Sequence, residues 1–472
     1  MRRIPIIFFL VLWAHTVGEA QALKTSADNR FLETLSGSPF FWTGDTGWEL
    51  FHRLDREEAA RYLTDRAEKG FNVIQAVALY ELQAFESPNA YGDYPLVGRD
   101  IMKPDTTVGN DPSKTGEYDY WDHVEYIITE AASHGMISGF LPCWGEYVTP
   151  RKREQVIGTV EQAYAYGWFV GNRFRALNDH MVWILGGDRL PDERENGVEI
   201  WRAMAEGISD AVNNTYGYNG QSDYNSTFMS YHCYTSSARW FHEDPWIDMH
   251  TWGSYHEKRD NERAYYEAQD DWKLSDPKPT LNSEPAYELL PVNYDWAEVS
   301  QGRFDDFDVR QQAYWSVFAG CCGHTYGCNP VWQMYKAENP DPPLTLQNTI
   351  EWEEALDEPG AFHMGYLKHL MLSRDFATRK PDQSILAENP HDPTGHLQAC
   401  SGYGYSLVYI PTGKVVKIHL DRIPASELSC SWFNPRKGTF QEIDPLKGGA
   451  IAEFDPPGEE ERGNDWVLVI DY

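Results

Sequence analysis

The sequence predicts an α/β fold, a (β/α)8 TIM barrel followed by a small antiparallel β-sandwich domain. Three observations support this. Eight short apolar runs recur along the chain, helical patterns separate most of them, and both features disappear after Asp375. Strands that alternate with helices form a parallel sheet, which eight repeats can close into a barrel. The chain of 472 residues is long enough for such a barrel and a smaller domain.

The apolar runs are short, as buried parallel strands are. Between the runs, apolar residues recur at three- and four-residue spacing, and the first of these helical patterns opens with Asp55 as a cap. We expect the strands at 40–44, 71–77, 137–142, 181–185, 228–232, 247–250, 279–282 and 323–326, and helices at 55–69, 120–134 and 194–213.

The chain after Asp375 has a different pattern. Short alternating runs follow one another, separated by Gly, Pro and Asp turns, which is typical of antiparallel strands. The runs lie at 405–410, 415–420, 429–433 and 466–470. We therefore predict a catalytic barrel over residues 23–375 and a β-sandwich domain over residues 376–472.

The first 22 residues have the pattern of a signal peptide. Arg2 and Arg3 precede an apolar run over 4–13, and Ala20-Gln21-Ala22 has the small-x-small form of a cleavage site. The run is short for a membrane span, and no later stretch approaches the roughly 18 apolar residues that a span needs. We expect a secreted or periplasmic protein without a retained membrane anchor.

Charge and aromatic content indicate the kind of partner. Lys and Arg total 40 against 72 Asp and Glu, so the net charge is −32, which repels nucleic acid and anionic membranes. We expect neither as a partner. Aromatic residues make up 14% of the chain, with 18 Trp and 28 Tyr. Such rings can stack on a polysaccharide or oligosaccharide substrate, although a Trp-rich core explains the composition equally well.

Seven cysteines leave an odd number in a chain that we expect to be exported. Cys400 and Cys430 lie in the predicted sandwich domain, where they could pair. The other five lie at or near the ends of apolar runs in the predicted barrel and favour buried thiols over a disulfide framework; they are Cys143, Cys233, Cys321, Cys322 and Cys328.

Two acidic residues follow apolar runs at points where strands are expected to end. Asp188 closes the run 181–188, and Glu284 closes the run 279–284. Paired carboxylates at the carboxyl ends of barrel strands are typical of glycosidic bond cleavage. We assign Asp188 as the acid/base and Glu284 as the nucleophile. The alternatives are structural: Asp188 caps the next segment or pairs with Arg189, and Glu284 pairs with Arg310.

Other polar and aromatic residues close to the ends of the strands are candidates for binding the sugar, because the loops after the strands build the active site of this fold. For any one of them a structural role is the simpler interpretation, so the prediction rests on their convergence. The candidates are Asp45, Trp48, Gln75, Trp144, His232, His250, Trp252, Tyr287, His324 and Tyr326.

Metal and cofactor chemistry are less well supported. Four histidines could supply imidazole ligands, but no H-E-x-x-H motif occurs, and the cysteine spacing lacks the partner pair of a zinc site. A G-x-S-x-G elbow and a glycine-rich phosphate loop are also absent from the sequence. We expect no metal and no cofactor; the four histidines are His232, His250, His256 and His324.

Several long motifs, in order along residues 24–375, resemble the apiosidase-like glycoside hydrolases of glycoside hydrolase family 140. The resemblance implies a barrel with its catalytic Asp at Asp188 and its catalytic Glu at Glu284, followed by a β-sandwich of a type labelled collagen-binding. Characterised relatives cleave at apiose in the pectic polysaccharide rhamnogalacturonan II. The motifs are Thr43 to Leu50, Gly171 to Phe174, Ile184 to Asp188, Lys278 to Glu288, Asp308 to Trp315 and Gly320 to Gly327.

Together these observations predict a secreted glycoside hydrolase that cleaves a plant cell-wall polysaccharide of the pectic class, with apiose in rhamnogalacturonan II as the expected point of attack. The expected mechanism is retaining, which places the two carboxyl groups about 5 to 5.5 Å apart, whereas an inverting enzyme needs roughly 6.5 to 9.5 Å. The alternative is a non-catalytic carbohydrate- or matrix-binding protein on a barrel scaffold.

Overall fold

The structure is a computed structural model that describes residues 22–80, 84–151, 155–295, 297–338, 348–425, 427–447 and 451–472. The predicted signal peptide, residues 1–22, therefore lies almost entirely outside the described residues. None of the helices in the described part of the chain is long and apolar enough to cross a membrane.

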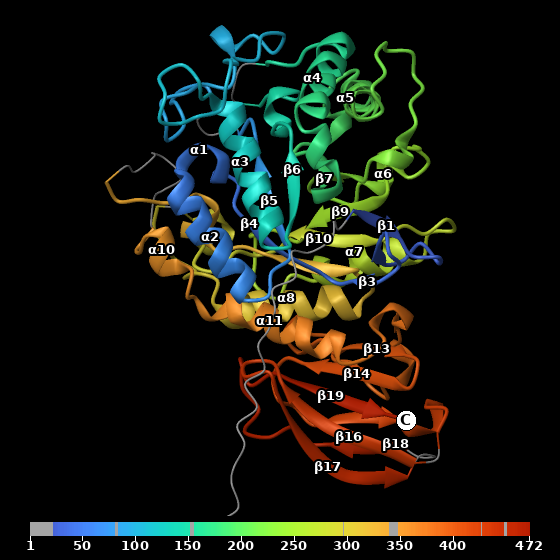
Figure 1. Ribbon diagram of the computed structural model, residues 1–472. Coiled ribbons are helices and arrows are strands. Elements are labelled where there is room, and N and C mark those ends of the chain that lie inside the picture. The colour runs from blue at the N-terminus through green and yellow to red at the C-terminus, as the bar shows by residue number, and fades with distance from the viewer. Residues whose placement is uncertain are drawn as a thin grey trace, which may run out of the picture.

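Eight parallel strands form one sheet in the order β10-β9-β8-β7-β6-β5-β4-β11 (Figure 1). The N–H of Cys322, just before β11, donates to the carbonyl of Thr280 on β10 over 2.9 Å, which brings the two edges of the sheet together. The predicted barrel is confirmed. Its strands are β4 (Trp42–Thr46), β5 (Val73–Val77), β6 (Ile137–Leu141), β7 (Met181–Gly186), β8 (Met229–His232), β9 (Met249–Gly253), β10 (Thr280–Glu284) and β11 (Gly323–Tyr326).

Helices follow the strands and surround the sheet, as Figure 1 shows. The cap predicted at Asp55 is present: its side chain accepts from the N–H of Glu58, and Glu58 accepts from the N–H of Asp55, each over 2.9 Å. The main helices are α2 (Arg56–Glu68), α3 (Tyr120–Ser133), α4 (Val160–Arg173), α5 (Gly197–Val212), α7 (Arg263–Trp272), α8 (Asp306–Phe318) and α11 (Pro359–Leu372); α1 (Leu50–Arg53), α6 (Ala238–Phe241), α9 (Asn329–Trp332) and α10 (Trp352–Ala355) are single turns.

The barrel strands are buried on both faces. One set of side chains, which includes Val182 and Ile184 of β7, fills the barrel interior. The alternate set, which includes Trp183 and Leu185, packs outward against the helices. This arrangement explains why the strands appear in the sequence as continuous apolar runs rather than alternating ones.

The carboxy-terminal residues form the predicted β-sandwich, which lies below α8 and α11 in Figure 1. A six-stranded antiparallel sheet has the order β12-β13-β14-β19-β16-β17, and β15 pairs with β18. A further small sheet, β1 (Leu23–Thr25), β2 (Leu32–Thr34) and β3 (Pro39–Phe40), precedes the barrel. The sandwich strands are β12 (Lys380–Pro381), β13 (Gln398–Gly402), β14 (Tyr405–Ile410), β15 (Val416–His419), β16 (Glu427–Asn434), β17 (Thr439–Lys447), β18 (Ile451–Phe454) and β19 (Trp466–Asp471).

The barrel and the sandwich share a buried interface. Arg310 of α8 donates to both carboxylate oxygens of Asp465, each over 2.8 Å, and both side chains are buried. The hydroxyl of Tyr409 on β14 donates to the same carboxylate over 2.9 Å. Tyr314 stacks on Tyr409 with ring centroids 4.9 Å apart. The ion pair is thus fully hydrogen-bonded and lies within an aromatic contact.

All seven cysteines lie within the described residues, and each is a buried free thiol. Five of them were expected to be buried thiols, and this is confirmed. Cys400 and Cys430, for which a disulfide was left open, do not pair either. Burial raises the pKa of the Cys400 thiol to about 12, so the thiolate, which is the reactive form, is disfavoured.

Candidate active site

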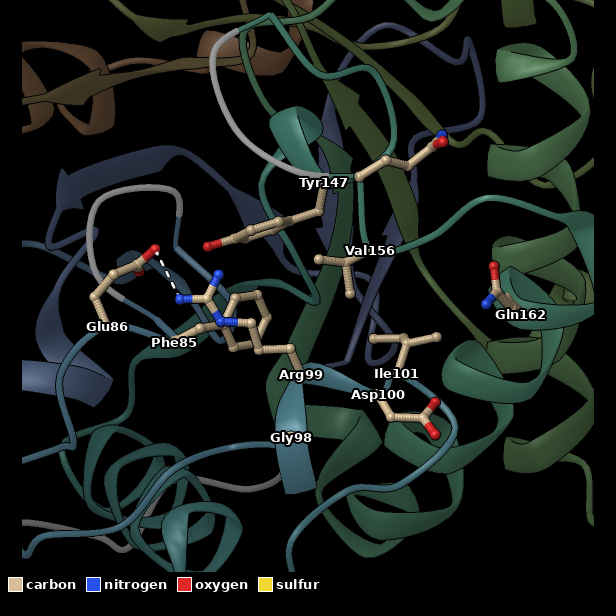
Figure 2. Close-up of a pocket in the computed structure, with 10 residues that line it drawn as sticks. Phe85, Glu86, Gly98, Arg99, Asp100, Ile101, Tyr147, Val156 and Gln162 are labelled. Carbon is tan, nitrogen blue, oxygen red and sulfur yellow. Dashed lines mark hydrogen bonds and ion pairs between the residues drawn. The ribbon is translucent and has the colours of Figure 1, made fainter.

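A small cavity of about 150 Å³ lies at the carboxyl ends of the barrel strands, where this fold places its active sites. Both predicted catalytic carboxylates line it. The other lining residues are Trp48, Tyr80, Trp144, His256, Tyr287, Leu290, Tyr294 and Trp332. A second, larger cavity of about 680 Å³ is lined chiefly by loops after β5 and β6 (Figure 2). The smaller cavity is the candidate active site because the paired carboxylates lie there.

Asp188 stands on an unusual turn after β7. Gly186, Gly187 and Asp188 all have positive φ, at 91°, 130° and 54°. A Cβ at Gly187 would lie 2.7 Å from the ring of Trp144 and 2.8 Å from the nitrogen of Gly145, so only glycine fits there. The turn directs the Asp188 carboxylate into the cavity, where its Oδ1 accepts from the Tyr255 hydroxyl over 2.8 Å.

Glu284 is directed into the cavity by a different device. The pairing of β10 with β9 shifts register between Asn282 and Glu284, which is a β-bulge. Leu281 belongs to the barrel interior, so strict alternation would turn Glu284 outward toward the helices. A bulge re-aims the side chain that follows it, and the Glu284 carboxylate reaches the cavity instead.

Two histidines hold the Glu284 carboxylate. His232, the last residue of β8, lies with its Nε2 2.9 Å from Oε2, and the Nε2 of His256 lies 3.4 Å from Oε1. The N–H of Tyr287 donates to Nδ1 of His256 over 3.3 Å, so the proton of neutral His256 is on Nε2 and points at Glu284. Each carboxylate oxygen therefore has an imidazole donor.

The contacts of His232 indicate that both ring nitrogens carry protons. The Ser283 hydroxyl donates to the carbonyl of Trp252 over 3.3 Å, which leaves its oxygen to accept from Nδ1 of His232 at 3.0 Å. The other nitrogen faces Glu284 at 2.9 Å and Asp188 at 3.8 Å. A histidine that donates from both nitrogens is an imidazolium.

The electrostatics agree with this charge pattern. Burial alone would lower the pKa of His232, but its hydrogen bond with Glu284 and the proximity of Asp188 at 3.8 Å outweigh burial and raise its pKa to about 9. Burial alone would raise the pKa of Glu284, but the hydrogen bonds from His232 and His256 lower it to about 2. Glu284 is thus held ionised in a buried site.

Asp188, His232 and Glu284 lie close enough for their polar atoms to surround a cation. One ligand atom from each lies within 4.8 Å of the others, which holds for no other such group in the described part of the chain. A metal ligand must be a neutral imidazole with a lone pair, whereas His232 donates a proton toward Glu284. These three side chains therefore fit two carboxyl groups beside a protonated histidine better than they fit a metal site.

Six of the residues predicted from the sequence meet at this cavity. Asp188, Glu284, Trp48, Trp144 and Tyr287 line it. His232 lies 2.9 Å from Glu284 and 3.8 Å from Asp188, and it packs against Trp48 and Trp144 with ring centroids 5.5 Å away in each case. The indole N–H of Trp48 donates to the Tyr287 hydroxyl over 3.1 Å. These aromatic side chains form one connected wall.

The other six do not line the cavity. Gln75 lies inside the barrel, where its amide donates to the carbonyl of Ser283 over 3.0 Å and so supports the strand that ends in Glu284. Asp45 points outward to Arg66, 3.2 Å away, and accepts from Tyr62 over 2.7 Å. The assignment of Asp45 to sugar binding is therefore replaced by a buried ion pair between strand and helix.

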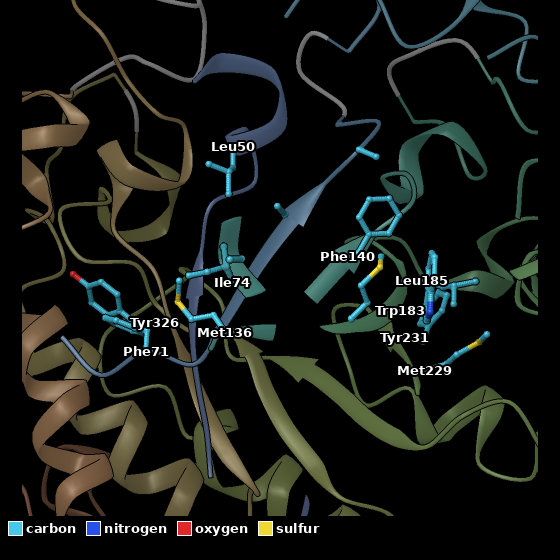
Figure 3. Close-up of a cluster of buried hydrophobic side chains, with 14 of the residues drawn as sticks. Leu50, Phe71, Ile74, Met136, Phe140, Trp183, Leu185, Met229, Tyr231 and Tyr326 are labelled. Atoms are coloured by element: carbon cyan, nitrogen blue, oxygen red, sulfur yellow. The ribbon is translucent and has the colours of Figure 1, made fainter. Parts of the chain in front are cut away.

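His250, Trp252, His324 and Tyr326 also face the helices. His250 contacts Ser237 and His242, and Trp252 donates to Thr280 over 2.9 Å. Tyr326 donates to Glu288. Its ring lies beside that of Phe71 (Figure 3). His324 is buried, and burial lowers its pKa to about 3. In each strand these residues alternate with residues that face the barrel interior. Both faces of the strand are buried, so the sequence alone does not reveal which residues point inward.

Six residues of the site were missed as sugar or carboxylate contacts: Tyr80, Tyr255, His256, Leu290, Tyr294 and Trp332. Tyr255 and His256 follow β9, whose strand was expected to end at His250 but extends to Gly253. Placing the strand end three residues later would have brought both into the set of loop candidates. Trp332, on α9 after β11, also lines the cavity, and its signal is a Trp soon after the last barrel strand.

The structural alternatives for the two acids are not what the structure shows. Arg189 pairs with Glu146 rather than with Asp188, with its Nε 2.7 Å from Oε2. Arg310 pairs with Asp465 at the domain interface rather than with Glu284. Both carboxylates instead face the cavity.

The barrel and its strand-end carboxylates define the class of this protein, a glycoside hydrolase. The family model described as "Apiosidase-like, catalytic domain" matches residues 26–378, and the one described as "Putative collagen-binding domain of a collagenase" matches residues 380–471. The chain belongs to the apiosidase-like family. A search of curated proteins gave no match.

Solved structures agree with this family. One described as a glycoside hydrolase is 31% identical, with 96% of this chain and 97% of that chain covered and a TM-score of 0.80. A glycoside hydrolase family 5 structure from Bacteroides vulgatus is 30% identical, with 96% and 94% covered and a TM-score of 0.80. Another Bacteroides vulgatus structure, 13% identical with a TM-score of 0.64, covers 96% and 83% and shares the fold.

Proposed function

We propose that this glycoside hydrolase is exported and cleaves a pectic polysaccharide of the plant cell wall at apiose, by a retaining mechanism with Asp188 and Glu284 as its catalytic residues. The observation that supports this most directly is the approach of the two carboxylates. An oxygen of each lies within 4.8 Å of the other, which favours the short separation of retaining enzymes over the roughly 6.5 to 9.5 Å of inverting ones.

In this proposal Glu284 attacks the anomeric carbon. Its pKa of about 2 keeps it ionised, and its two histidine donors fix its orientation. Asp188 gives its proton to the leaving oxygen and later takes a proton from the water that releases the sugar. The Asp188 side chain is 27% exposed, against 8% for Glu284, which suits a group that exchanges protons with water.

The choice of sugar rests on the family and on the shape of the cavity. The matched family is apiosidase-like, and a cavity of about 150 Å³ with an aromatic wall suits one small sugar ring rather than a long chain. Export is supported by the residues that precede the described part of the chain, with their basic start, apolar run and small-x-small end.

The proposal is tested by measuring reducing-sugar release from rhamnogalacturonan II fragments, apiosides, arabinofuranosides and galactans. We expect the wild type to release apiose, and Glu284→Gln to lose at least about a thousandfold in kcat because the nucleophile is gone. Glu288→Gln is a matched control, since Glu288 is equally buried but bonded to Tyr326 behind the site. Full activity of Glu284→Gln, or release only from substrates without apiose, would contradict the proposal.

A further inference from the structure

Tyr255 contacts both members of the proposed catalytic pair, although neither step of the proposed reaction uses it. It follows β9, and its N–H donates to the backbone carbonyl of Glu284 over 3.0 Å. Its hydroxyl donates to Oδ1 of Asp188 over 2.8 Å. Tyr255 thus ties the end of β10 to the turn that follows β7, which holds the two catalytic residues in one fixed relation.

The ring of Tyr255 is packed tightly. It is buried and stacks on Tyr234, with ring centroids 4.9 Å apart and an angle of 26° between the planes. The guanidinium of Arg263 in turn lies over Tyr234, 4.1 Å from the ring centroid. A Cβ on Gly253 would lie 2.2 Å from the Tyr255 ring, so this ring packs directly against the backbone of β9. The hydroxyl oxygen of Tyr255 therefore has one fixed position, beside Asp188.

The backbone at Tyr255 is strained in a way that favours a role in the reaction. Its φ of 53° lies in the left-handed region, which a bulky aromatic residue rarely adopts. Such strain is concentrated at active sites, where surrounding contacts maintain it. His256, the next residue, directs its Nε2 at Glu284 over 3.4 Å. The strained segment thus places one donor on each carboxylate, Tyr255 on Asp188 and His256 on Glu284.

The two donors that the described residues place beside the Asp188 carboxyl group face the same oxygen atom. Oδ1 accepts from Tyr255, and Nε2 of His232 lies 3.8 Å from it. Burial, together with the negative charges of Asp188 and Glu284, raises the pKa of Tyr255 well above its usual value of 10, so this hydroxyl keeps its proton and donates. An oxygen that accepts from a neighbouring donor is a poor place for the carboxyl group's own proton, which leaves Oδ2 to carry it.

We infer that Tyr255 is the positioning residue of the acid, and that its hydrogen bond to Oδ1 assigns the catalytic proton to Oδ2 of Asp188. The inference rests on the proposed function, because it uses Asp188 as the acid.

The role of Oδ2 can be followed through both steps. In the first step the Oδ2–H bond breaks as its proton passes to the glycosidic oxygen. The bond between that oxygen and the anomeric carbon breaks with its electron pair going to the oxygen, while Glu284 forms a bond with the carbon. In the second step water attacks the carbon, displaces Glu284 and gives a proton back to Oδ2. Tyr255 holds Oδ1 in both steps, so the same oxygen gives the proton and takes it back.

Tyr255→Phe removes the hydroxyl and keeps the ring. Without the donor, the Asp188 carboxyl group can rotate and its proton can lie on either oxygen, so protonation of the leaving oxygen is impaired. We expect kcat/KM, which reports the steps up to departure of the leaving group, to fall roughly a hundredfold on methyl apioside, whose leaving group needs a proton. On 2,4-dinitrophenyl apioside, whose leaving group departs without one, it should stay within about threefold of the wild type.

Tyr409→Phe is the matched control. Its hydroxyl is also buried and also donates to an aspartate, Asp465, over 2.9 Å, but it lies at the domain interface. We expect this variant to lower the Tm while the ratio of the two kcat/KM values stays as in the wild type. Equal losses on both apiosides in Tyr255→Phe, or no loss on either, would overturn the inference.

A measurement without substrate separates the inference from the proposed function. Neutron diffraction from deuterated crystals of the wild type, acidified until Asp188 is protonated, shows which oxygen carries the deuteron. We expect the deuteron on Oδ2, with the Tyr255 hydroxyl donating to Oδ1. This result supports the positioning role even if no apioside is cleaved, in which case the proposed function alone fails. A deuteron on Oδ1, or a Tyr255 hydroxyl that donates elsewhere, would overturn the inference even in an active apiosidase.

Discussion

His232 shows how one side chain sets the charges of the proposed catalytic pair. It is fully buried, and each of its ring nitrogens faces an oxygen, Ser283 on one side and Glu284 on the other. A buried cation is costly unless it is paired, and here the ionised Glu284 pairs with it over 2.9 Å. In exchange, Glu284 keeps its negative charge in a place where burial alone would favour the protonated acid.

This arrangement predicts the pH dependence of His232→Gln. The glutamine can still donate to Glu284 but has no charge, so the pKa of Glu284 should rise from about 2 toward its ordinary value of 4.5 or above. A protonated Glu284 cannot attack, so activity is lost as pH falls through this pKa. We expect the acid limb of the kcat/KM profile to move to higher pH by at least about one unit.

His250→Gln is the matched control for that profile. His250 is buried on the adjacent strand but faces the helices, and burial lowers its pKa to about 3, so it is neutral and far from the charge pattern of the site. Its acid limb should coincide with that of the wild type. An unshifted limb in His232→Gln would show that the histidine charge does not hold Glu284 ionised.

At the scale of the elements, two strand ends depart from regular geometry, and both departures place a carboxylate. The turn that begins at the last residue of β7 has three successive residues of positive φ, and β10 has a bulge before Glu284. Regular ends would point the two side chains elsewhere, because alternation fixes the face of each residue. Irregular backbone at these points is therefore part of the site rather than a defect of the barrel.

Gly187→Ala tests the turn. A Cβ would meet Trp144 and Gly145 at under 3 Å on a backbone with φ of 130°, so the turn must move and Asp188 with it. We expect kcat to fall by roughly a hundredfold, the effect of about 1 Å of misplacement. Gly37→Ala, with φ of 86° and nothing within 4 Å, is the control that adds backbone strain without touching the site. Similar kcat values for both variants would contradict this account.

At the scale of the whole molecule, the sandwich domain is built against the barrel. Leu407 and Tyr409 of β14 belong to the core that includes α8. Val408 and Ile410 face the other way, toward the two-stranded sheet of β15 and β18. The strand β14 is thus buried on both faces. Removing the sandwich domain would expose the apolar surface of α8 and α11, so we expect the two parts to unfold together.

Asp465→Asn tests this coupling. Arg310 would keep its charge at a buried interface with a weaker partner, and losing one member of such a pair costs roughly 3 to 5 kcal/mol. We expect one cooperative transition at a lower Tm, measured by calorimetry. Asp471→Asn is the control: its pair with Arg374 also joins the two parts but is partly exposed, and it should cost less than about 1 kcal/mol. Equal effects, or two separate transitions, would contradict the coupling.

The sequence by itself determined the barrel, the sandwich and the positions of Asp188 and Glu284. These features depend on local signals: apolar runs, helical spacing, turn residues, and acids placed where a strand stops. The strand predicted at 323–326 and that at 405–410 have the observed bounds of β11 and β14. Local patterns suffice here because each element is formed by residues close in the chain.

Only the tertiary structure decided which strand-end residues meet. Both faces of a barrel strand are buried, so apolar patterning does not separate inward His232 from outward His250. The contact between His232 and Glu284 joins residues 52 positions apart, and that between Tyr255 and Asp188 joins residues 67 apart. Such pairings arise from the closure of the barrel, from one bulge and from one glycine turn, and the charges of the site follow from them.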